Sequence, residues 1–327
     1  MRVLVFVSQP VKAWSIPASH VNELRARFPS VEFVHASTPE EAHEAIRDAD
    51  VAFTHFLRPE MVADAPKLRW IQASTAGVAG LYPLDQLTAR GIAVTNVRGL
   101  HGVAIAEQVM AGLLALGRRL PEAFDAQRQH RWIQNDLAEN YPTLLSGKRL
   151  TIVGLGAIGL EIAKRANAFG VQVTGVRRRV DGPKPPSVHR LVATDRLDEA
   201  LSGCQILVIT APGIAATQGM IGARELSMLE PDAVLVNVAR AAIVDQEAML
   251  DALEGGRLGG AVLDVFEQEP LDPTSALWDM RNVILTPHSS GFRATHWDEV
   301  IELFSDNLRR FEAGEPLLQV VDSTAGY

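Results

Sequence analysis

The chain has 327 residues, of which 47% are hydrophobic and 21% charged, and its formal net charge is −8. This length leaves room for two domains with sizeable cores, and the composition excludes a largely disordered chain. The negative charge argues against nonspecific binding to nucleic acid or to an anionic membrane, so we expect the partner to be a small molecule.

Cys204 is the only cysteine, which excludes an intrachain disulfide and a cysteine-rich metal site. We expect no metal. The apolar run at 3–7 predicts a first strand and not a signal peptide, and the longest apolar segment, 103–116, is too short to span a bilayer. Together with the lone cysteine, which fits a reducing compartment, these features predict a cytoplasmic protein.

The segment before Arg98 alternates short apolar runs with helix-like stretches, which predicts a parallel sheet with helices on both faces. The expected elements are strands at 3–7, 51–53, 68–72 and 92–96 and a helix at 40–47. A helix that is apolar nearly all round is expected next, over 103–120. We place the first domain boundary at Arg98.

The segment 151–159 is an apolar strand that leads into Gly154, Gly156 and Gly159 and then into a helix. In such a Gly-x-Gly-x-x-Gly turn the first glycine allows the tight turn, the second lets backbone approach a pyrophosphate, and the third lets helix pack on strand. The helix N-terminus offers N–H groups to the phosphates. A second apolar run at 171–176 completes a strand, helix, strand unit, which favours a dinucleotide site over a simple glycine-rich turn.

The end of that second strand bears on which dinucleotide binds. An NAD site usually carries Asp or Glu there to bind the ribose hydroxyls, whereas a 2′-phosphate requires cations. This chain has Arg177, Arg178 and Arg179, which favours NADP(H). A solvated basic turn is the alternative interpretation, with Asp181 as an acidic partner for the ribose.

Further apolar runs predict strands at 206–210, 234–238, 260–264 and 283–286, which would extend a doubly wound sheet. The helix expected at 295–311 cannot form a domain alone and should pack on the N-terminal portion. We therefore expect a discontinuous first domain, residues 1–98 plus 292–327, and a dinucleotide-binding domain at 99–291.

Polar residues follow three of these strands, at the edge where open parallel sheets bind ligands. Arg240 offers a planar fork of donors suited to a carboxylate, although a surface pair with Asp245 is an alternative. The segment 263–271 holds three acids. His288 closes the last strand, and its ordinary titration range suits proton transfer, although a lone histidine is more often structural.

The chain resembles the D-isomer specific 2-hydroxyacid dehydrogenases over nearly all of its length. The resemblance rests on the glycine turn and on the segments 73–78, 96–116, 237–240, 264–271 and 286–288. It implies two doubly wound parallel-sheet domains, a Rossmann cofactor domain and a flavodoxin-like substrate domain. It also implies an oxidoreductase that transfers hydride between NADPH and a small 2-oxoacid such as glyoxylate or hydroxypyruvate, giving a D-2-hydroxyacid.

The resemblance assigns roles residue by residue. Arg240 would bind the substrate carboxylate and carbonyl, His288 would be the acid/base, and Glu269 would pair with His288. Asp264 would hold the nicotinamide carboxamide. The implied cofactor contacts are Gly154, Gly156, Ala157, Ile158, Gly159, Arg177, Arg178, Ala211, Pro212, Thr217, Val238, Ala239, Arg240, Asp264 and His288. The implied substrate contacts are Thr75, Ala76, the backbone N–H groups of Gly77 and Val78, Arg240 and His288.

Leu57 and Arg58 are candidates for the substrate pocket beside Thr75, although strand-end residues often serve packing alone. The segment 211–217 departs from the family, which more often has Pro-Leu-Thr there. Relatives pair through the cofactor domain, so we expect a homodimer, with 119–145, which includes Trp132 and Tyr141, as the exchanged arm.

Two other functions compete with the reductase. Corepressors that resemble this family use the fold to sense dinucleotides, although the set Arg240, Glu269 and His288 argues for catalysis. Formate and phosphite dehydrogenases also resemble the family. Glu269 argues against the formate type, and the absence of lysine between Leu68 and Gly80 argues against the phosphite type.

Overall fold

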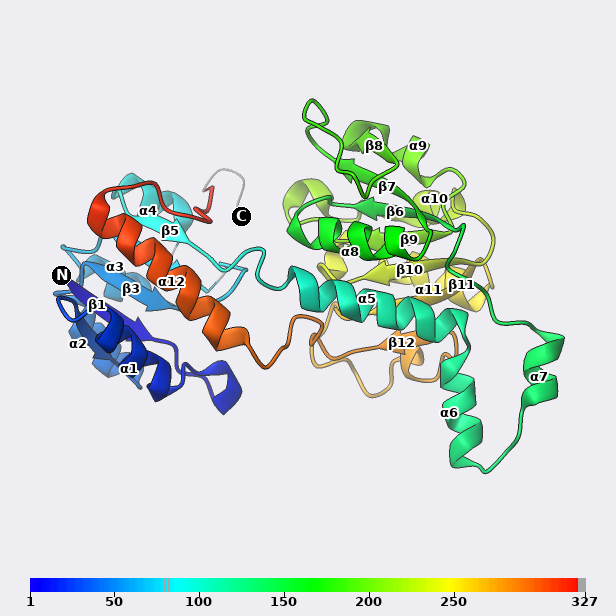
Figure 1. The fold of residues 1–327 in the computed structure, drawn as a ribbon, viewed down its shortest axis with the longest axis horizontal. Helices are drawn as coiled ribbons and strands as arrows, with labels where there is room; N and C mark the ends of the chain where they lie inside the picture. The colour runs from blue at the N-terminus through cyan, green and yellow to red at the C-terminus, as the bar shows by residue number, and fades with distance from the viewer. Residues whose placement is uncertain (79, 82, 323–327) are drawn as a thin grey trace. The chain divides into compact units, whose positions relative to one another are not determined.

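The computed structural model describes residues 1–78, 80, 81 and 83–322, so the last five residues of the predicted first domain lie outside the described residues. The chain divides into two compact units, residues 1–100 with 293–327 (unit 1) and residues 101–292 (unit 2) (Figure 1). None of the helices in the described ranges combines the length and the apolar character needed to cross a membrane.

Unit 1 contains a five-stranded parallel sheet in the order β2-β1-β3-β4-β5. Its strands are β1 (Arg2–Phe6), β2 (Glu32–His35), β3 (Val51–Thr54), β4 (Trp70–Ala73) and β5 (Ala93–Thr95). Its helices are η1 (Lys12–Trp14), α1 (Ala18–Arg27), α2 (Pro39–Ile46), α3 (Pro59–Ala63), α4 (Leu84–Ala89) and α12 (His296–Ala313).

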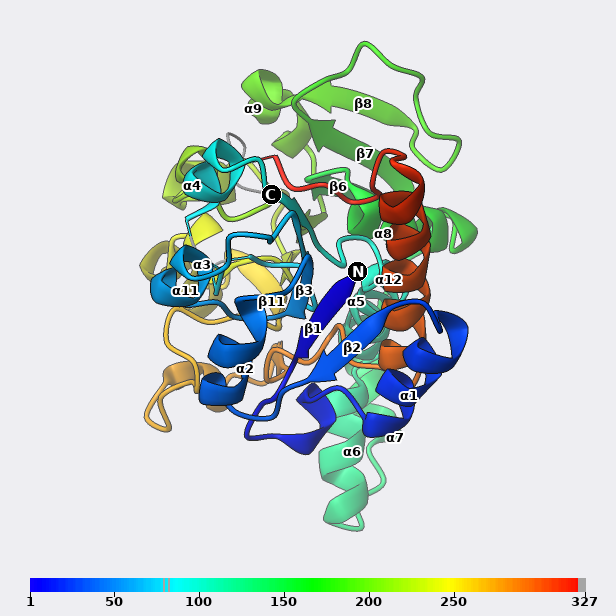
Figure 2. The same ribbon diagram turned by 90° about the vertical axis from the view of Figure 1, so that its left-hand side faces the viewer.

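Helices cover both faces of this sheet. Successive side chains of a strand point to opposite sides, so each face has an apolar cluster of its own. Leu4 and Phe6 of β1 belong to one apolar cluster with α2 and α3, while Val3 and Val5 belong to another with α1 and α12. Figure 2 shows α1 and α12 on one side of the strands and α2 and α3 on the other.

The C-terminal helix α12 completes the second of these clusters. Its Phe304 ring lies 4.7 Å from that of Phe53 and 5.4 Å from that of Trp70, centroid to centroid. The helix ends at Ala313, and the residue that follows, Gly314, has a left-handed φ of 68° that suits glycine. Helix α12 is thus part of the core of unit 1.

Unit 2 contains a seven-stranded parallel sheet in the order β12-β11-β10-β9-β6-β7-β8. Its strands are β6 (Arg149–Val153), β7 (Gln172–Arg177), β8 (Arg190–Ala193), β9 (Ile206–Ile209), β10 (Ala233–Asn237), β11 (Leu258–Leu263) and β12 (Val283–Leu285). The strand order reverses direction between β6 and β9, which is where doubly wound sheets bind ligands. The predicted fold class, two doubly wound parallel sheets, is confirmed.

The helices of unit 2 are α5 (Gly102–Gly117), α6 (Leu120–Arg128), α7 (Gln134–Glu139), α8 (Ala157–Ala168), α9 (Leu197–Leu201), α10 (Ala223–Ser227) and α11 (Gln246–Glu254), with short turns η2 (Thr194–Arg196), η3 (Ala215–Thr217), η4 (Ala241–Ile243) and η5 (Ala276–Trp278). The single helix predicted over 103–120 was wrong at its end. It stops at Gly117, and Arg119, with a φ of 55°, turns the chain into α6.

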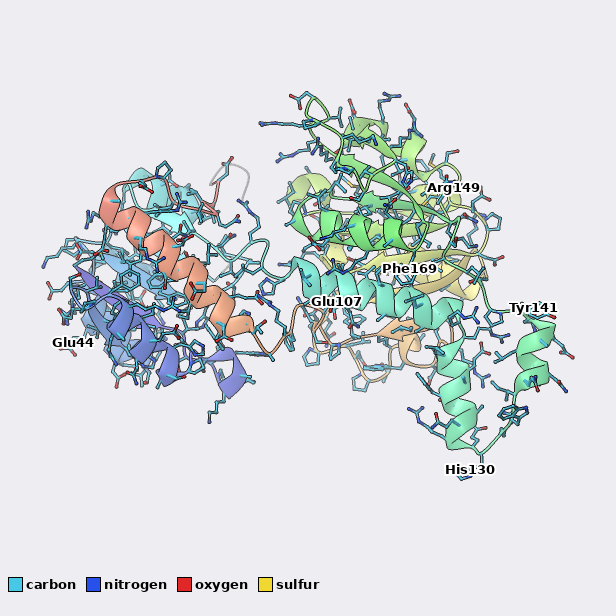
Figure 3. The ribbon with its side chains drawn as sticks, viewed as in Figure 1. Glu44, Glu107, His130, Tyr141, Arg149 and Phe169 are labelled. Carbon is cyan, nitrogen blue, oxygen red and sulfur yellow. The ribbon has the colours of Figure 1, made fainter. Side chains whose placement is uncertain are left out.

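Helices α6 and α7 extend away from the sheet of unit 2 (Figure 1). His130 lies at the far turn between them, and Tyr141 lies on the returning segment (Figure 3). Trp132 is 89% exposed and Tyr141 is 80% exposed. Large apolar side chains are therefore presented to solvent along this projection.

Candidate active site

Three polar residues stand at one edge of the sheet of unit 2. Arg240 lies three residues beyond the end of β10, Asp264 directly follows β11, and His288 lies three residues beyond the end of β12. These strands are neighbours and run parallel, so their carboxyl ends meet at the same edge. The register places Asn237 beside Leu263, and Leu263 beside Leu285.

His288 and Glu269 form a hydrogen-bonded pair. The distance from His288 Nδ1 to Glu269 Oε2 is 2.7 Å, and the second carboxylate oxygen, Oε1, accepts the Phe266 N–H at 3.0 Å. This hydrogen bond uses Nδ1, and the side chain is 51% exposed, so the other ring nitrogen, Nε2, is the one that a ligand can reach. The carboxylate thus fixes the ring through Nδ1, as expected for a histidine acid/base.

The surroundings of Glu269 favour its ionised form. Partial burial acts to raise the pKa of Glu269, but hydrogen bonds from His288 and from the Phe266 N–H oppose it. The positive charges of His288 and Arg240 act in the same lowering direction, and the net pKa of Glu269 lies below its ordinary 4.5. At neutral pH the group beside His288 is therefore a carboxylate.

A buried asparagine shapes the turn that carries Arg240. The Asn237 side chain accepts the Ala239 N–H at 3.1 Å and donates to the Arg240 carbonyl at 3.1 Å. Gly213 lies under the arginine, since a Cβ atom there would be 2.7 Å from Arg240 Cγ. The alternative pair with Asp245 is not formed, because the Asp245 carboxylate accepts the Ala248 N–H at 3.0 Å and caps α11.

The loop between β6 and α8 is a backbone cradle. Gly154 has a φ of 101° and packs against the backbone of Ala211, and a Cβ on Gly159 would lie 2.6 Å from the Gly154 carbonyl oxygen. A Cβ on Gly156 would meet no atom of the described structure within 4 Å. Ala157 and Ile158 form the first turn of α8, where helical N–H groups have no partner in the helix. These residues fit a dinucleotide pyrophosphate at Gly156.

Arg177 is the last residue of β7, beside the cradle, since both the Gly154 and the Leu155 N–H groups donate to the Val176 carbonyl. Its Nε is buried and has no hydrogen-bond partner among the described residues. A buried donor normally has a partner, and a phosphate oxygen would supply one. Arg178 and Arg179 follow directly and are exposed.

The turn after β9 has its own internal bonds. The Thr217 hydroxyl donates to the Pro212 carbonyl at 2.7 Å and accepts the Ile214 N–H at 3.0 Å. The Thr217 hydroxyl is therefore used within the turn. Ala211, which begins this turn, packs against Gly154. Val238 and Ala239, also named from the resemblance, are buried in the turn before Arg240.

The substrate residues named in unit 1 lie on the loop after β4. Thr75, Ala76 and Gly77 are exposed, and the Thr75 hydroxyl donates to the Gly77 carbonyl at 2.6 Å. Asn96, which is 1% exposed, donates to the Ala76 carbonyl at 2.8 Å. Val78 is buried, so only its backbone is suited to a polar ligand.

The two other pocket candidates of unit 1, Leu57 and Arg58, differ in their exposure to solvent. The idea that Leu57 lines a pocket was wrong, because its side chain is buried in the apolar cluster under the sheet. Arg58 is exposed, and its guanidinium carbon lies 5.9 Å from the centre of the Phe56 ring.

Sequence reasoning missed the residues that support the site. Asn237, Ser290 and Asn96 are buried polar side chains that hold strand-end turns in place. The only sequence signal was a short polar residue at the end of an apolar run, a residue type that bonds to nearby backbone. Asp264 was assigned to the cofactor, and its carboxylate also accepts hydrogen bonds from the turn that carries His288.

A glycine cradle at the switch point of a doubly wound sheet, with a histidine and carboxylate pair at the same edge, defines a dinucleotide-dependent oxidoreductase. The family model of the D-isomer specific 2-hydroxyacid dehydrogenase, NAD binding domain, matches residues 110–290. The glyoxylate reductase of Thermococcus gammatolerans is 34% identical over 330 residues, covering 96% of this chain and 94% of the relative. The chain belongs to the D-isomer specific 2-hydroxyacid dehydrogenase family.

Solved structures agree. A D-isomer specific 2-hydroxyacid dehydrogenase family protein from Aeromonas salmonicida is 33% identical, with a TM-score of 0.82, covering 98% of this chain and 99% of the other. An NADPH-dependent glyoxylate/hydroxypyruvate reductase from Sinorhizobium meliloti, in complex with NADP and sulfate, is 26% identical, with a TM-score of 0.80, covering 100% and 99%. This chain is thus an NAD(P)-dependent oxidoreductase of the 2-hydroxyacid dehydrogenase type.

Proposed function

We propose that this enzyme reduces a small 2-oxoacid, such as glyoxylate or hydroxypyruvate, to the 2-hydroxyacid, of D configuration where the product is chiral, with NADPH as the preferred reductant. The observation that carries the proposal is the 2.7 Å pair of His288 and Glu269 at the same sheet edge as Arg240. The names of similar reductases support the same substrate class.

The bound reduced nicotinamide would supply a hydride to the carbonyl carbon of the substrate. His288, held through Nδ1 by Glu269, would carry a proton on Nε2 and give it to the carbonyl oxygen as the C–O double bond becomes a C–OH single bond. Arg240 would bind the substrate carboxylate and stabilise charge on the carbonyl oxygen. The hydride and this proton together balance the reduction.

NADPH preference rests on the basic end of β7. The buried Arg177 Nε without a partner is the atom we propose for the 2′-phosphate, with Arg178 beside it. Arg177→Asp should weaken NADPH binding far more than NADH binding, because only NADPH has the phosphate. The NADH constant of the same variant is the control, and equal losses for both cofactors would refute the assignment.

We propose unit 1 as the substrate domain and unit 2 as the cofactor domain. In unit 1 the loop 75–78 would offer the N–H groups of Gly77 and Val78 to the substrate carboxylate. The hydrogen bond from Asn96 to the Ala76 carbonyl would preserve the shape of this loop. Asn96→Ala should therefore raise KM for the oxoacid and leave the Kd for NADPH unchanged.

We also propose a homodimer in the cytoplasm. Exposed apolar side chains along the α6 and α7 projection, among them Trp132 and Tyr141, support an interface there. The lone buried Cys204 supports a reducing compartment. Light scattering should give twice the chain mass, and Trp132→Asp should reduce it; a monomeric wild-type protein would refute the dimer.

The product identifies the reaction most specifically. With NADPH and pyruvate, chiral chromatography should show D-lactate, and His288→Gln should abolish its formation while NADPH still binds. L-lactate, or undiminished turnover by His288→Gln, would overturn the proposed chemistry.

A further inference from the structure

A segment from beyond α12 covers the edge strand β5 of the unit 1 sheet. An edge strand leaves backbone N–H and C=O groups unpaired unless another segment covers it. Here the Val94 carbonyl accepts the Val321 N–H at 2.8 Å. The Asn96 N–H, one residue past the strand, donates to the Gln319 carbonyl at 3.2 Å, and an antiparallel bridge lies between these two bonds. Residues 318–321, here called the docked segment, thus extend the sheet.

Unit 1 holds the docked segment near both of its ends. The buried Asn307 of α12 accepts the Leu318 N–H at 2.7 Å and donates to the Leu318 carbonyl at 3.1 Å. Val321 is 8% exposed and belongs to the same apolar cluster as Val78 and Val94. Hydrogen bonds therefore fix one end of the segment, and apolar burial fixes the other.

Gln319 has the unusual backbone conformation within this segment. Its φ of 56° is left-handed, which costs free energy in a residue other than glycine. Its side-chain Oε1 accepts the Arg98 Nε at 3.3 Å, while its carbonyl accepts the Asn96 N–H. Gln319 thus presents two acceptors to the residues that follow β5.

Asn96 connects the docked segment to the loop after β4. Its N–H is bonded to the Gln319 carbonyl, and its side chain donates to the Ala76 carbonyl at 2.8 Å. The next N–H, of Val97, donates to the Thr75 carbonyl of the same loop at 3.4 Å. Asn96 is 1% exposed, so its N–H would be buried without a partner if the docked segment moved away. The position of the loop therefore depends on the docked segment.

We infer that Gln319 is a positioning residue for the substrate, because the docked segment keeps the loop 75–78 in the shape that receives the substrate carboxylate. The inference rests on the proposed function, in which the Gly77 and Val78 N–H groups bind that carboxylate. Such binding depends on orientation, and a misplacement of about 1 Å can cost about 10²-fold. The docked segment and the loop both belong to unit 1, so the effect should fall on the oxoacid and not on the dinucleotide.

The test compares Gln319→Pro and Gln319→Gly with the wild-type enzyme. Proline fixes φ at about −65° and displaces the carbonyl of residue 319, whereas glycine adopts the left-handed conformation freely and keeps the carbonyl in place. We expect Gln319→Pro to raise KM for pyruvate about tenfold, with an unchanged Kd for NADPH. The Kd of oxamate, an unreactive pyruvate analogue, for the NADPH complex should rise by the same factor. In Gln319→Gly each constant should match the wild-type value.

Two further variants complete the comparison. Val21→Ala is the control for a general loss of stability, because Val21 is buried in the other apolar cluster of unit 1. It should lower the melting temperature and leave KM for pyruvate unchanged. Val321→Asp places a charge in the apolar cluster and should expel the docked segment from it. It should raise KM as Gln319→Pro does, and it carries the test should Gln319→Pro fail to fold.

Hydrogen exchange separates failure of this inference from failure of the proposed function. The Val97 amide, which bonds the loop, should exchange faster in Gln319→Pro and Val321→Asp than in the wild-type protein and Gln319→Gly. Wild-type KM and oxamate Kd in Gln319→Pro and Val321→Asp would overturn the inference, as would an equal rise of KM in Val21→Ala. A wild-type protein that reduces no 2-oxoacid would overturn the proposed function instead. Faster exchange at Val97 would then still support the hold on the loop, and unchanged exchange would overturn it.

Discussion

Alanine at Gly156 and at Gly159 should have opposite effects. A Cβ at Gly159 would lie 2.6 Å from the Gly154 carbonyl oxygen and 3.1 Å from Ile152 Cγ2. Because the first of these atoms is backbone, the cradle itself must shift, at a cost of about 1–3 kcal/mol. The melting temperature should fall about 2–4 °C for each kcal/mol lost.

Gly156→Ala should leave stability within about 0.5 kcal/mol of the wild-type value, since the added methyl meets no atom of the described residues within 4 Å. Its φ of −91° is open to alanine. The methyl would instead occupy the space where the pyrophosphate must approach. We expect the Kd for NADPH to rise at least about tenfold, or about 1.4 kcal/mol.

The assay is thermal unfolding without cofactor, paired with fluorescence titration of NADPH, for both variants and the wild-type protein. Each variant is the control for the other. Wild-type affinity in Gly156→Ala would refute the placement of the pyrophosphate, and wild-type stability in Gly159→Ala would refute the close approach of helix to strand.

Three further effects follow from the structure. Glu269→Gln should lower kcat about 10²-fold at pH 7. The pKa of Glu269 in the folded protein lies below its ordinary 4.5, so the stability that its carboxylate contributes is fully present above pH 4.5 and is lost only as the pH falls through the lower folded value. The rate profile should likewise show no limb due to Glu269 above pH 4.5, and such a limb would contradict this. Cys204 is buried, and burial raises the pKa of its thiol, so Ellman's reagent should react with it only after denaturation. A fast reaction with the native protein would contradict this expectation. Asn307→Ala should destabilise the protein by about 1–3 kcal/mol, because the Asn307 side chain donates hydrogen bonds to the Gln72 side-chain oxygen and to the Leu318 carbonyl, and accepts one from the Leu318 N–H. An unchanged denaturation midpoint would contradict this.

Much of the fold could be predicted from the sequence because the central strands are continuous apolar runs between turn residues. The edge strands β2 and β8 were missed, since both are short and carry exposed polar residues such as Glu32 and Arg190. The glycine turn was predictable for a similar reason. Its residues are adjacent in sequence, and Gly154 and Gly159 each meet a local steric need.

The support of the site was not predictable in the same way. Asp264 and Ser290 are far apart in sequence and meet only because β11 and β12 are paired in a particular register. Leu57 looked like a pocket residue because it follows a strand, yet the chain turns it into the core. Such contacts depend on side-chain direction at strand ends, which a hydrophobic pattern does not specify.

The most direct measurement is the rate of NADPH and of NADH oxidation, followed by nicotinamide absorbance, with glyoxylate, hydroxypyruvate, pyruvate and phenylpyruvate in parallel. We expect turnover with the small oxoacids, a higher kcat/KM with NADPH than with NADH, and loss of turnover in His288→Gln. Cofactor that binds but is not oxidised with any of these acids would contradict the proposed reduction of 2-oxoacids and favour a dinucleotide-sensing role.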